Sequence, residues 1–428
     1  MKKILSCILC AICFCSASYA QLKEACSFYV YDYNNVPEAT PTPEGYKPFY
    51  ISQFARHGAR YCTSEYSRLY NCLSKASADG KLTDAGKEFF SRYEPFYHQV
   101  KNCSGNLTGV GKAQHRAIAT RLFQRYPEVF EGQTNIEAVS TESPRVIMSM
   151  WSCLAQLAAL DTDLNINADA SAKYASWLQP SLPANPYYVK GGFTGCDSAT
   201  KAVEDYFYKV VPYKEIVEKF LVSTDVLEKD QKITIKRFIS DLHAVVTATY
   251  CLDENRGCFD DVFTPEQLKQ VYKGQSAGYF LDVANYVGSG HHVLDYAHFT
   301  LEQIIESADA DIASGKTQLR LRYGHDSGIG PLITVFNING YGNPTTSFEE
   351  GLEIFPSYCV PMGASVQLIF FKNDEGDVLV KTLLSEQEVT LPFEAVQGPY
   401  YRWEDFKKYY LPRISEAKKK VENLMLTM

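Results

Sequence analysis

The residues best suited to chemistry in this chain stand together in the stretch RHGAR, residues 56–60, directly after the apolar stretch 49–55. Two guanidiniums, of Arg56 and Arg60, flank the imidazole of His57 there. Planar guanidiniums hold the oxygens of a phosphoryl group in a fork geometry that lysine does not reproduce. A histidine between them is placed to attack phosphorus, because fixed positive charge stabilises the transition state. The stretch therefore predicts an anion-binding loop with a nucleophile at its centre.

Two further stretches share this design of a predicted strand, a sharp break and then polar residues. Residues 136–141 precede ESPR, which ends at Arg145, and residues 318–324 precede His325 and Asp326. Ligands of open α/β sheets bind outside the carboxyl ends of the strands, so we expect all three stretches to converge on one site. The predicted site consists of the catalytic residues His57 and Asp326 and the phosphate-binding residues Arg56, Arg60, Arg145 and His325.

These groups together suit phosphoryl transfer. His57 would attack in line and form a phosphohistidine, while Asp326 would protonate the leaving alkoxide and then activate water. The fixed positive charge makes a metal ion or other cofactor unnecessary. Single residues also have structural readings: Asp326 suits a cap on a helix entered at Gly328. Arg145 at a helix start opposes the helix dipole, which hints at a bound anion.

Strands and helices alternate at both ends of the chain, which predicts a three-layer α/β sandwich with a mixed, mostly parallel central sheet. The region from about 161 to 290 carries helical patterns with few strand signals and predicts an inserted helical cap. Further elements are predicted as helices over 82–101, 107–127, 144–160 and 300–313, a hairpin over 364–391 that turns at 373–376, and a C-terminal helix. The predicted organisation is a signal peptide (1–20), two parts of one α/β domain (21–160 and 291–428) and the cap (161–290).

The first twenty residues read as a signal peptide. Lys2 and Lys3 precede a short apolar stretch, and small residues end at Ala20, which suits cleavage. The alternative is an N-terminal membrane anchor, which the shortness of the apolar core disfavours. No other segment has 18 uninterrupted apolar residues, so we expect a mature chain without a membrane span. The expected location is the periplasm or the medium.

The charge of the chain restricts its partners. The formal net charge is −8, and an acidic surface argues against nucleic acid and anionic membranes. A small anionic phosphorylated substrate must therefore meet a local basic cluster such as RHGAR. Basic residues of the predicted cap would suit further phosphates, although interleaved acids favour a solvated role. They are Lys201, Lys209, Lys214, Lys219, Lys232, Lys236 and Arg237.

Nine of the 13 cysteines lie beyond residue 20, so an exported chain keeps at least one thiol that is either unpaired or bonded to another molecule. Cys251 and Cys258 form the best local pair, and Cys62, Cys72 and Cys103 allow a second. Beyond residue 20, the sequence contains no C-x-x-C or H-x-x-x-H spacing that would indicate a metal site. The sequence leaves the disulfide connectivity and the oligomeric state open.

These motifs resemble the histidine acid phosphatase family, whose signature is R-H-G-x-R-x-P followed by a distant H-D. The stretch LTGVGKAQ from Leu107 is similar to the family element L-T-x-x-G-x-x-Q, and STESPRV to the segment with the third phosphate-binding arginine. The resemblance implies a phosphoglycerate mutase-like fold with a helical cap and the site roles given above. It also implies phosphomonoester hydrolysis, leaning to inositol polyphosphates such as phytate. A broad-specificity or sugar-phosphate acid phosphatase is the alternative.

Two positions depart from the family pattern. Cys62 replaces the motif's proline, and Ser64 stands where H-D phytases commonly carry a lysine that holds the substrate. RHGARY-x-T resembles the multiple inositol polyphosphate phosphatase branch, whereas the pair His325-Asp326 does not, because that branch carries H-A-E. The sequence therefore predicts the reaction class more firmly than the substrate.

Three other functions compete with hydrolysis through His57. The stretch GQSAG matches the nucleophile elbow of serine hydrolases with Ser276, but the elbow needs a preceding strand and PEQLKQVYK reads as a helix. A phosphohistidine mutase keeps the fold, yet export and a large cap favour a hydrolase. A silent phosphate-binding protein would not need both His57 and Asp326.

Overall fold

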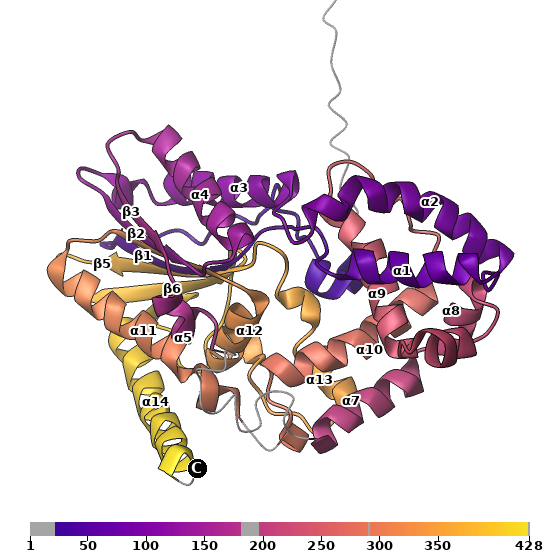
Figure 1. Cartoon of the computed structure of the whole chain (residues 1–428). Helices are drawn as coiled ribbons and strands as arrows, with labels where there is room; N and C mark the ends of the chain where they lie inside the picture. The colour runs from indigo at the N-terminus through magenta and orange to yellow at the C-terminus, as the bar shows by residue number, and fades with distance from the viewer. Residues whose placement is uncertain (1–21, 181–196, 290–291, 427–428) are drawn as a thin grey trace, which may run out of the picture.

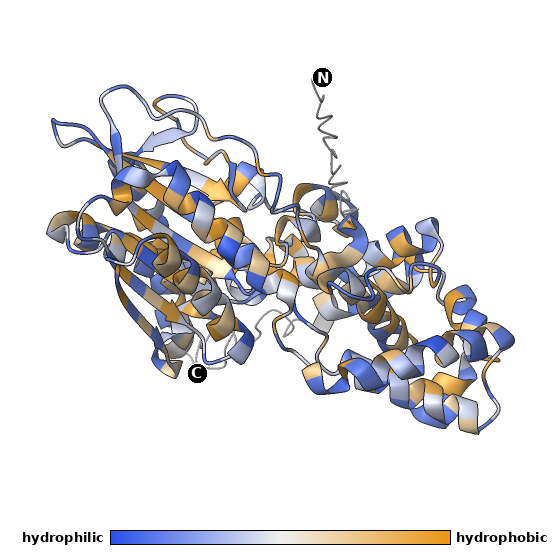
Figure 2. Ribbon diagram, turned by 90° about the horizontal axis from the view of Figure 1, so that it is seen from above, coloured by the Kyte–Doolittle hydropathy of each residue, from blue (hydrophilic) through white to orange (hydrophobic). Residues whose placement is uncertain are grey.

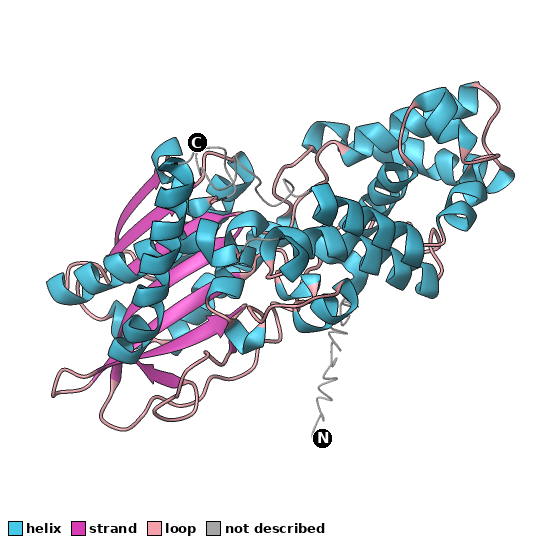
Figure 3. Ribbon diagram, turned by 90° about the horizontal axis from the view of Figure 1, so that it is seen from below, coloured by secondary structure: helices cyan, strands magenta, loops and turns pink. Residues whose placement is uncertain are grey.

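The computed structural model describes residues 22–180, 197–289 and 292–426. The predicted signal peptide lies outside the described residues. The described chain forms two lobes, one built on a β-sheet and one built from helices alone (Figure 1; Figure 3). None of the described helices combines the length and the hydropathy that a membrane span requires.

The sheet is mixed and has the order β3-β2-β4-β1-β5-β6-β7, with β8 paired to β6. Strands β3, β2, β4 and β1 run parallel to one another, whereas β5 is antiparallel to both β1 and β6. The predicted strands and the hairpin are confirmed. The bounds are β1 Lys47–Arg56, β2 Asn135–Ser140, β3 Asn165–Ala170, β4 Leu319–Gly324, β5 Ser365–Lys372, β6 Val378–Leu384, β7 Gln387–Glu388 and β8 Tyr400–Arg402.

Helices cover both faces of the sheet, which confirms the predicted three-layer sandwich. Strand β1 is buried over nearly its whole length, as expected for a strand covered on both sides. One face shares a core with α3 and α4, and the other with α11, α12 and α14. Figure 2 shows the strands as hydrophobic bands between helices of mixed colour. The bounds are α3 Gly109–Arg125, α4 Pro144–Leu160, α11 Val293–Ser314, α12 Asp326–Val335 and α14 Trp403–Leu426.

The helical lobe is assembled from two separate parts of the chain. Helices α1 and α2 come from the region that the sequence assigned to the α/β domain, yet Phe89 of α2 packs against Phe220 and Phe259 of the later part. An amphipathic pattern shows which face of a helix is apolar but not which partner covers it. The bounds are α1 Glu65–Ala78, α2 Asp84–Val100, α7 Asp197–Val210, α8 Tyr213–Phe220, α9 Ile235–Ala248 and α10 Pro265–Val283.

Strand β3 was not predicted. Its sequence, NINADA, lacks an apolar run, and the strand pairs only with β2 at the edge of the sheet. An edge strand with one neighbour needs few apolar residues. The sheet therefore continues past Leu160, where the helical insertion was predicted to begin.

Short elements complete the described chain. They are α5 Ala175–Leu178, α13 Phe348–Ile354, a π-helix η5 Val226–Gln231 and the 3₁₀ segments η1 Lys23–Phe28, η2 Lys101–Cys103, η3 Pro127–Phe130, η4 Ala172–Tyr174, η6 Thr249–Cys251, η7 Val287–Ser289, η8 Ile338–Gly340 and η9 Ser357–Cys359.

The eight cysteines within the described residues are all free thiols. The predicted pair of Cys251 and Cys258 is therefore not formed. Cys251 is buried and donates to the carbonyl of Phe28 at 3.5 Å, whereas Cys258 is only half-buried. Cys62 is also buried, with its thiol 3.5 Å from the carbonyl of Ala244.

Candidate active site

The three strands that carry the predicted site end level with one another. Arg56 of β1 lies opposite Gly324 of β4, and Ser140 of β2 lies opposite Tyr323. The backbone N–H of His57 then donates to the Gly324 carbonyl at 3.0 Å. The three polar stretches that follow these strands therefore meet at one edge of the sheet, beside the helical lobe (Figure 1).

The RHGAR loop is held against the start of α3 and the side of α4. A Cβ at Gly58 would overlap the backbone of Gly111, so this close approach requires glycine. The N–H of Gly58 donates to the hydroxyl of Ser149 at 3.0 Å, and that of Ala59 donates to the side-chain oxygen of Gln114 at 2.8 Å. The loop backbone is thus fixed on both sides of its glycine.

His57 is buried and has a defined tautomer. Its Nδ1 lies 2.9 Å from the carbonyl oxygen of Gly58, which can only accept, so Nδ1 carries the proton. Nε2 is left with its lone pair. Burial, together with the charges of Arg56 and Arg60, holds the pKa of His57 well below its usual value. The imidazole is therefore neutral in mildly acidic solution and has a nucleophilic nitrogen available.

Arg56 is fully buried, and its guanidinium bonds to residues from three other parts of the chain. Its Nη1 donates to the carbonyl of Val360, and its Nη2 donates to the carbonyl of Ser27, each at 2.8 Å. Nη2 also forms an ion pair with the carboxylate of Asp326 at 2.9 Å. Arg56 therefore places the carboxylate of α12 next to the end of β1.

Asp326 opens α12, and its side chain is 29% exposed. Its Oδ1 accepts from the N–H of Ser327 at 3.0 Å. Burial by itself would raise the pKa of Asp326, but the charges of Arg56 and Arg60 outweigh it and lower the pKa below its usual value. The carboxyl is consequently ionised in the ligand-free chain.

Arg145 and His325 contact each other. Arg145 Nη2 lies 3.3 Å from Nδ1 of His325, and Nε2 of His325 lies 3.1 Å from the hydroxyl of Thr141. Since a guanidinium only donates, Nδ1 accepts and Nε2 carries the proton. Burial and the charge of Arg145 lower the pKa of His325 to about 4. Both ring nitrogens are thus engaged within the protein.

The three predicted phosphate-binding arginines share an unusual feature. The Nε–H groups of Arg56, Arg60 and Arg145 are all buried and have no hydrogen-bond partner among the described residues. Leaving one buried donor without an acceptor costs about 1–3 kcal/mol, so native structures rarely do it. Burial and the charge of Arg60 also lower the pKa of Arg145 to about 10. Three guanidiniums with such donors, gathered at one sheet edge, suit a bound anion.

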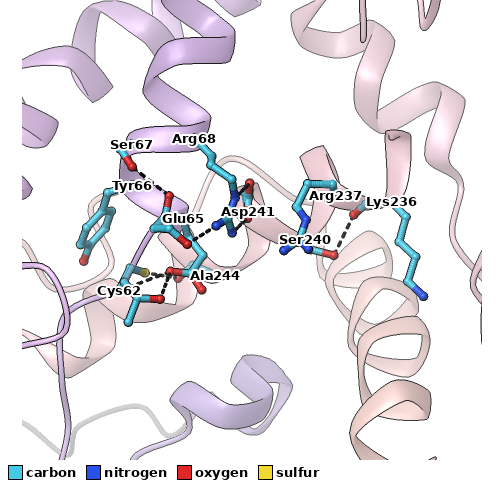
Figure 4. Close-up of polar contacts among 12 residues, drawn as sticks. Cys62, Glu65, Tyr66, Ser67, Arg68, Lys236, Arg237, Ser240, Asp241 and Ala244 are labelled. Carbon is cyan, nitrogen blue, oxygen red and sulfur yellow. Dashed lines mark hydrogen bonds and ion pairs between the residues drawn. The ribbon is translucent and has the colours of Figure 1, made fainter. Parts of the chain in front are cut away.

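A cleft of about 270 Å³ leads from Asp326 into the helical lobe. Across it, Arg68 of α1 forms a two-pronged ion pair with Asp241 of α9, at 2.8 and 2.5 Å (Figure 4). Ser64 accepts from the same guanidinium. The cleft is lined by Ala25, Cys26, Ser27, Phe28, Arg60, Glu65, Arg68, Arg237, Ser240, Asp241, His243, Ala244, Gln275, Tyr279 and Asp326.

Of the seven cap residues predicted for further phosphates, Arg237 lines this cleft. Its side chain is exposed and makes no hydrogen bond or ion pair with the described residues. Three of the others are satisfied elsewhere: Lys201 by Asp205, Lys209 by Glu349 and Lys219 by the carbonyls of Asp261 and Val262.

Ser276 is not placed for nucleophilic attack. It lies in the middle of α10 rather than after a strand, and it is 1% exposed. Its hydroxyl pairs with that of Ser357 at 2.8 Å. The elbow reading therefore fails, because the motif's geometry requires a strand-to-helix turn.

Sequence reasoning missed several supporting residues. Gln114 lies in the recognised L-T-x-x-G-x-x-Q element, and Thr141 directly follows β2, so both had a local signal. Ser27 and Phe28 had none, because only the tertiary fold brings them to the site. Within the part of the chain that the structure describes, no group of three or more His, Cys, Asp or Glu side chains is arranged to hold a metal ion.

Comparisons with solved structures show that the fold is shared with known proteins. The structure of Bifidobacterium longum multiple inositol polyphosphate phosphatase with inositol hexasulfate is similar, with a TM-score of 0.72 and 18% identity over 90% of this chain and 97% of that one. The D. castellii phytase has a TM-score of 0.66 and 16% identity, covering 92% and 85% of the two chains. The Hafnia alvei phytase with tartrate has a TM-score of 0.54 and 12% identity, covering 88% and 98%.

At these identities the solved structures establish the fold. No curated protein matches the chain. The model of the histidine phosphatase superfamily (branch 2), however, matches residues 53–385, a span that contains every residue of the predicted site. The chain therefore belongs to the histidine phosphatase superfamily, branch 2.

Proposed function

We propose that this chain is an exported acid phosphatase that hydrolyses phosphomonoesters through a phosphohistidine on His57. The observation that carries the proposal is the set of three buried, unpartnered Nε–H groups of Arg56, Arg60 and Arg145 around a neutral imidazole. A phosphoryl group supplies the oxygens that these donors lack. Its arrival also offsets the concentration of positive charge at the sheet edge.

In the first step, the lone pair of His57 Nε2 forms a bond to phosphorus while the bond from phosphorus to the ester oxygen breaks. Asp326 transfers its proton to that oxygen, which leaves as an alcohol. The hydrogen bond from Nδ1–H to the Gly58 carbonyl, 2.9 Å long, keeps the ring oriented and stabilises the positive charge that develops on it.

In the second step, water attacks the phosphohistidine. The carboxylate of Asp326 accepts a proton as the water oxygen bonds to phosphorus and the bond from phosphorus to Nε2 breaks. Inorganic phosphate leaves, the Nε2 lone pair is restored and Asp326 is again protonated. The arginines hold the phosphoryl oxygens throughout, and no metal ion takes part.

Asp326 must carry a proton when substrate is bound, although Arg56 and Arg60 hold its pKa below the usual value in the ligand-free chain. A bound phosphoryl group neutralises these arginines and places negative charge near the carboxylate. Both changes raise the pKa of Asp326 and favour the acid form. The low pKa of His57 keeps the nucleophile neutral at the same time, so acid pH suits both groups.

His325 takes a supporting part in this scheme. Its Nδ1 accepts from Arg145 and its Nε2 donates to Thr141, so it orients the third arginine. Direct contact between His325 and phosphate, as the resemblance implies, requires it to exchange one of these bonds when the ligand enters.

The proposed substrates are inositol polyphosphates, with other small phosphomonoesters as the alternative. Support comes from the similar structures, one of which is a multiple inositol polyphosphate phosphatase solved with inositol hexasulfate. Arg237 lies across the cleft from Asp326 and suits a second phosphate. Ser64 stands where H-D phytases commonly carry a lysine, and its hydroxyl accepts a hydrogen bond from Arg68. This position therefore carries no positive charge of its own. Export rests on the signal-like pattern of residues 1–20.

The test is phosphate release from phytate and from p-nitrophenyl phosphate, with EDTA present, by wild type and His57→Ala. We expect wild type to be active with EDTA and His57→Ala to lose about 10⁴-fold or more in kcat. Activity that depends on added metal would contradict the proposal, as would a fully active His57→Ala. A ratio of kcat/KM that favours p-nitrophenyl phosphate would select the broad-specificity alternative.

A further inference from the structure

The segment Lys23–Phe28, here called the N-terminal strap, joins both lobes beside the site. On the helical lobe, His243 of α9 contacts the carbonyl of Glu24 at 2.9 Å. On the sheet lobe, the N–H of Met362 donates to the carbonyl of Tyr29, the next residue, at 2.7 Å. The strap is therefore anchored at both ends and cannot shift without breaking bonds to one lobe or the other.

The strap contacts two of the three arginines of the site. The carbonyl of Ser27 accepts from Nη2 of Arg56 at 2.8 Å. The ring of Phe28 lies under Arg60, with its centre 4.8 Å from the guanidinium carbon. Arg56 has two further partners, Val360 and Asp326. The side chain of Arg60 makes only one hydrogen bond with the described residues, to the carbonyl of Tyr61. The Phe28 ring is thus a second contact of the Arg60 guanidinium within the described chain.

The strap also adopts a conformation that side-chain-bearing residues rarely choose. Cys26 has φ = 50° and ψ = −122°, in a region that favours glycine. This bend turns Ser27 and Phe28 toward the arginines, and residues 25–28 form one wall of the cleft. Such strain persists only where the surrounding contacts hold it. The bend is consistent with a segment shaped by the site rather than by its own preference.

We propose that the strap is part of the active site and that Phe28 is a positioning residue for Arg60. The ring attracts the guanidinium through a cation–π interaction, and its flat surface restricts the guanidinium to the orientation that meets the phosphoryl group. The strap's bond to Arg56 fixes the neighbouring guanidinium in the same way. The inference rests on the proposed phosphate-binding role of Arg60.

The simpler reading is that Phe28 only fills the core of the helical lobe, in which it is 5% exposed. The chain offers a matched control for this reading. Phe259 belongs to the same core, is 2% exposed and lies beneath another arginine, Arg92, at 5.9 Å. Arg92 pairs with Asp261 and lies outside the proposed site. Phe259→Leu therefore reproduces the packing loss without touching a phosphate-binding group.

The experiment compares Phe28→Leu, Phe28→Tyr and Phe259→Leu by thermal unfolding, by kcat/KM and by the inhibition constant of inorganic phosphate. Phe28→Leu is expected to weaken phosphate binding about tenfold, because the variant loses the cation–π contact with Arg60. Phe28→Tyr keeps the ring and is expected to retain phosphate binding. Phe259→Leu is expected to lower Tm to a similar extent but to bind phosphate like wild type.

A second comparison uses Arg60→Ala as the background. If Phe28 acts through Arg60, Phe28→Leu adds no further loss of phosphate binding there. An equal loss in both backgrounds would overturn the inference, as would unchanged phosphate binding in Phe28→Leu. Should Phe28→Leu fail to fold, Phe28→Met takes its place, because its flexible, unbranched side chain adapts to the space that the ring leaves. A wild type that neither hydrolyses phosphomonoesters nor binds phosphate would contradict the proposed function itself.

Discussion

The arginines at the strand ends differ in their hydrogen bonds from Arg68, the arginine on the opposite wall of the cleft. Arg56, Arg60 and Arg145 keep buried Nε–H groups without acceptors in the described chain. Arg68, on the facing wall, has its Nε and Nη2 bound to Asp241 and its Nη1 bound to Ser64. Both walls of the cleft therefore carry arginines, but only the arginine of the helical lobe has an acceptor for its Nε–H group.

This difference separates guanidiniums whose Nε–H groups have no acceptor from a guanidinium whose Nε, Nη1 and Nη2 all have acceptors within the fold. Unpaired buried donors destabilise a ligand-free protein, and such a cost is typical of binding sites. A bidentate ion pair on the opposite wall instead joins α1 to α9 and holds the cleft's shape. Removing an arginine from each wall should therefore change activity and stability in opposite proportions.

The largest effect is expected at Asp326, the carboxylate that pairs with Arg56. Asp326→Asn cannot donate a proton, so kcat for alkyl phosphates should fall about 10³-fold. p-Nitrophenyl phosphate has a leaving group that needs little protonation and should lose only about tenfold. The measurement is kcat for a series of esters with leaving groups of different pKa. Equal losses across the series would refute the assignment of Asp326 as proton donor.

Arg145→Ala tests the arginines at the strand ends, which we expect to bind the phosphoryl group. We expect kcat/KM to fall about 10²-fold, the usual cost of losing one donor to a developing oxyanion. Stability should be unchanged or slightly higher, because Arg145 is a half-buried cation. Burial and the charge of Arg60 lower its pKa to about 10, so the folded chain disfavours the charged form of this side chain. Urea unfolding without phosphate measures this directly. A large loss of stability with intact activity would assign Arg145 a structural role instead.

Arg68→Ala tests the ion pair between Arg68 and Asp241 on the opposite wall of the cleft. It leaves the buried carboxylate of Asp241 without its partner and should cost about 1–3 kcal/mol at pH 7. Burial already raises the pKa of Asp241, and the variant should raise it further. The folded state then binds a proton more readily than the unfolded state, so the loss of stability should shrink as pH falls.

Urea unfolding of Arg68→Ala at pH 7 and pH 4 checks this sign. Asp241→Asn in the same background removes the unpaired charge and should restore part of the stability at pH 7. A loss that grows toward low pH would show that the ion pair is not its cause.

The smallest effect is expected from Arg237→Ala. This exposed side chain lines the cleft, so it should contribute only to substrates with a second anionic group. We expect KM for phytate to rise about threefold at low ionic strength, with kcat unchanged. KM for p-nitrophenyl phosphate should stay the same. Equal changes for both substrates would show that Arg237 does not contact a second phosphate.

The sequence revealed the chemistry at the strand ends more readily than the surroundings of the site. Strand β1 reads clearly because its residues are buried on both faces, and the RHGAR stretch follows at once. Strand β3 could not be seen, because an exposed edge strand such as NINADA needs no apolar pattern. The predicted convergence followed from a general rule about parallel strands rather than from any local feature.

Partners distant in sequence account for most of what was missed. The packing of Phe89 against Phe259 decides which lobe α2 joins, and no periodicity encodes it. Likewise, Ser27 reaches Arg56 only through the tertiary fold. The tautomer of His57 depends on one backbone carbonyl, that of Gly58, whose position the sequence does not specify.

The central claim is that His57 becomes phosphorylated during turnover. The most direct test mixes the enzyme briefly with a ³²P-labelled phosphomonoester and stops the reaction with a denaturant that is not acidic. Peptide mapping then locates the label. We expect a label that approaches one phosphate per chain, is stable to base and labile to acid, and lies on the His57 peptide. A wild type that turns over without such a label, or a His57→Asn variant that labels equally, would contradict the account.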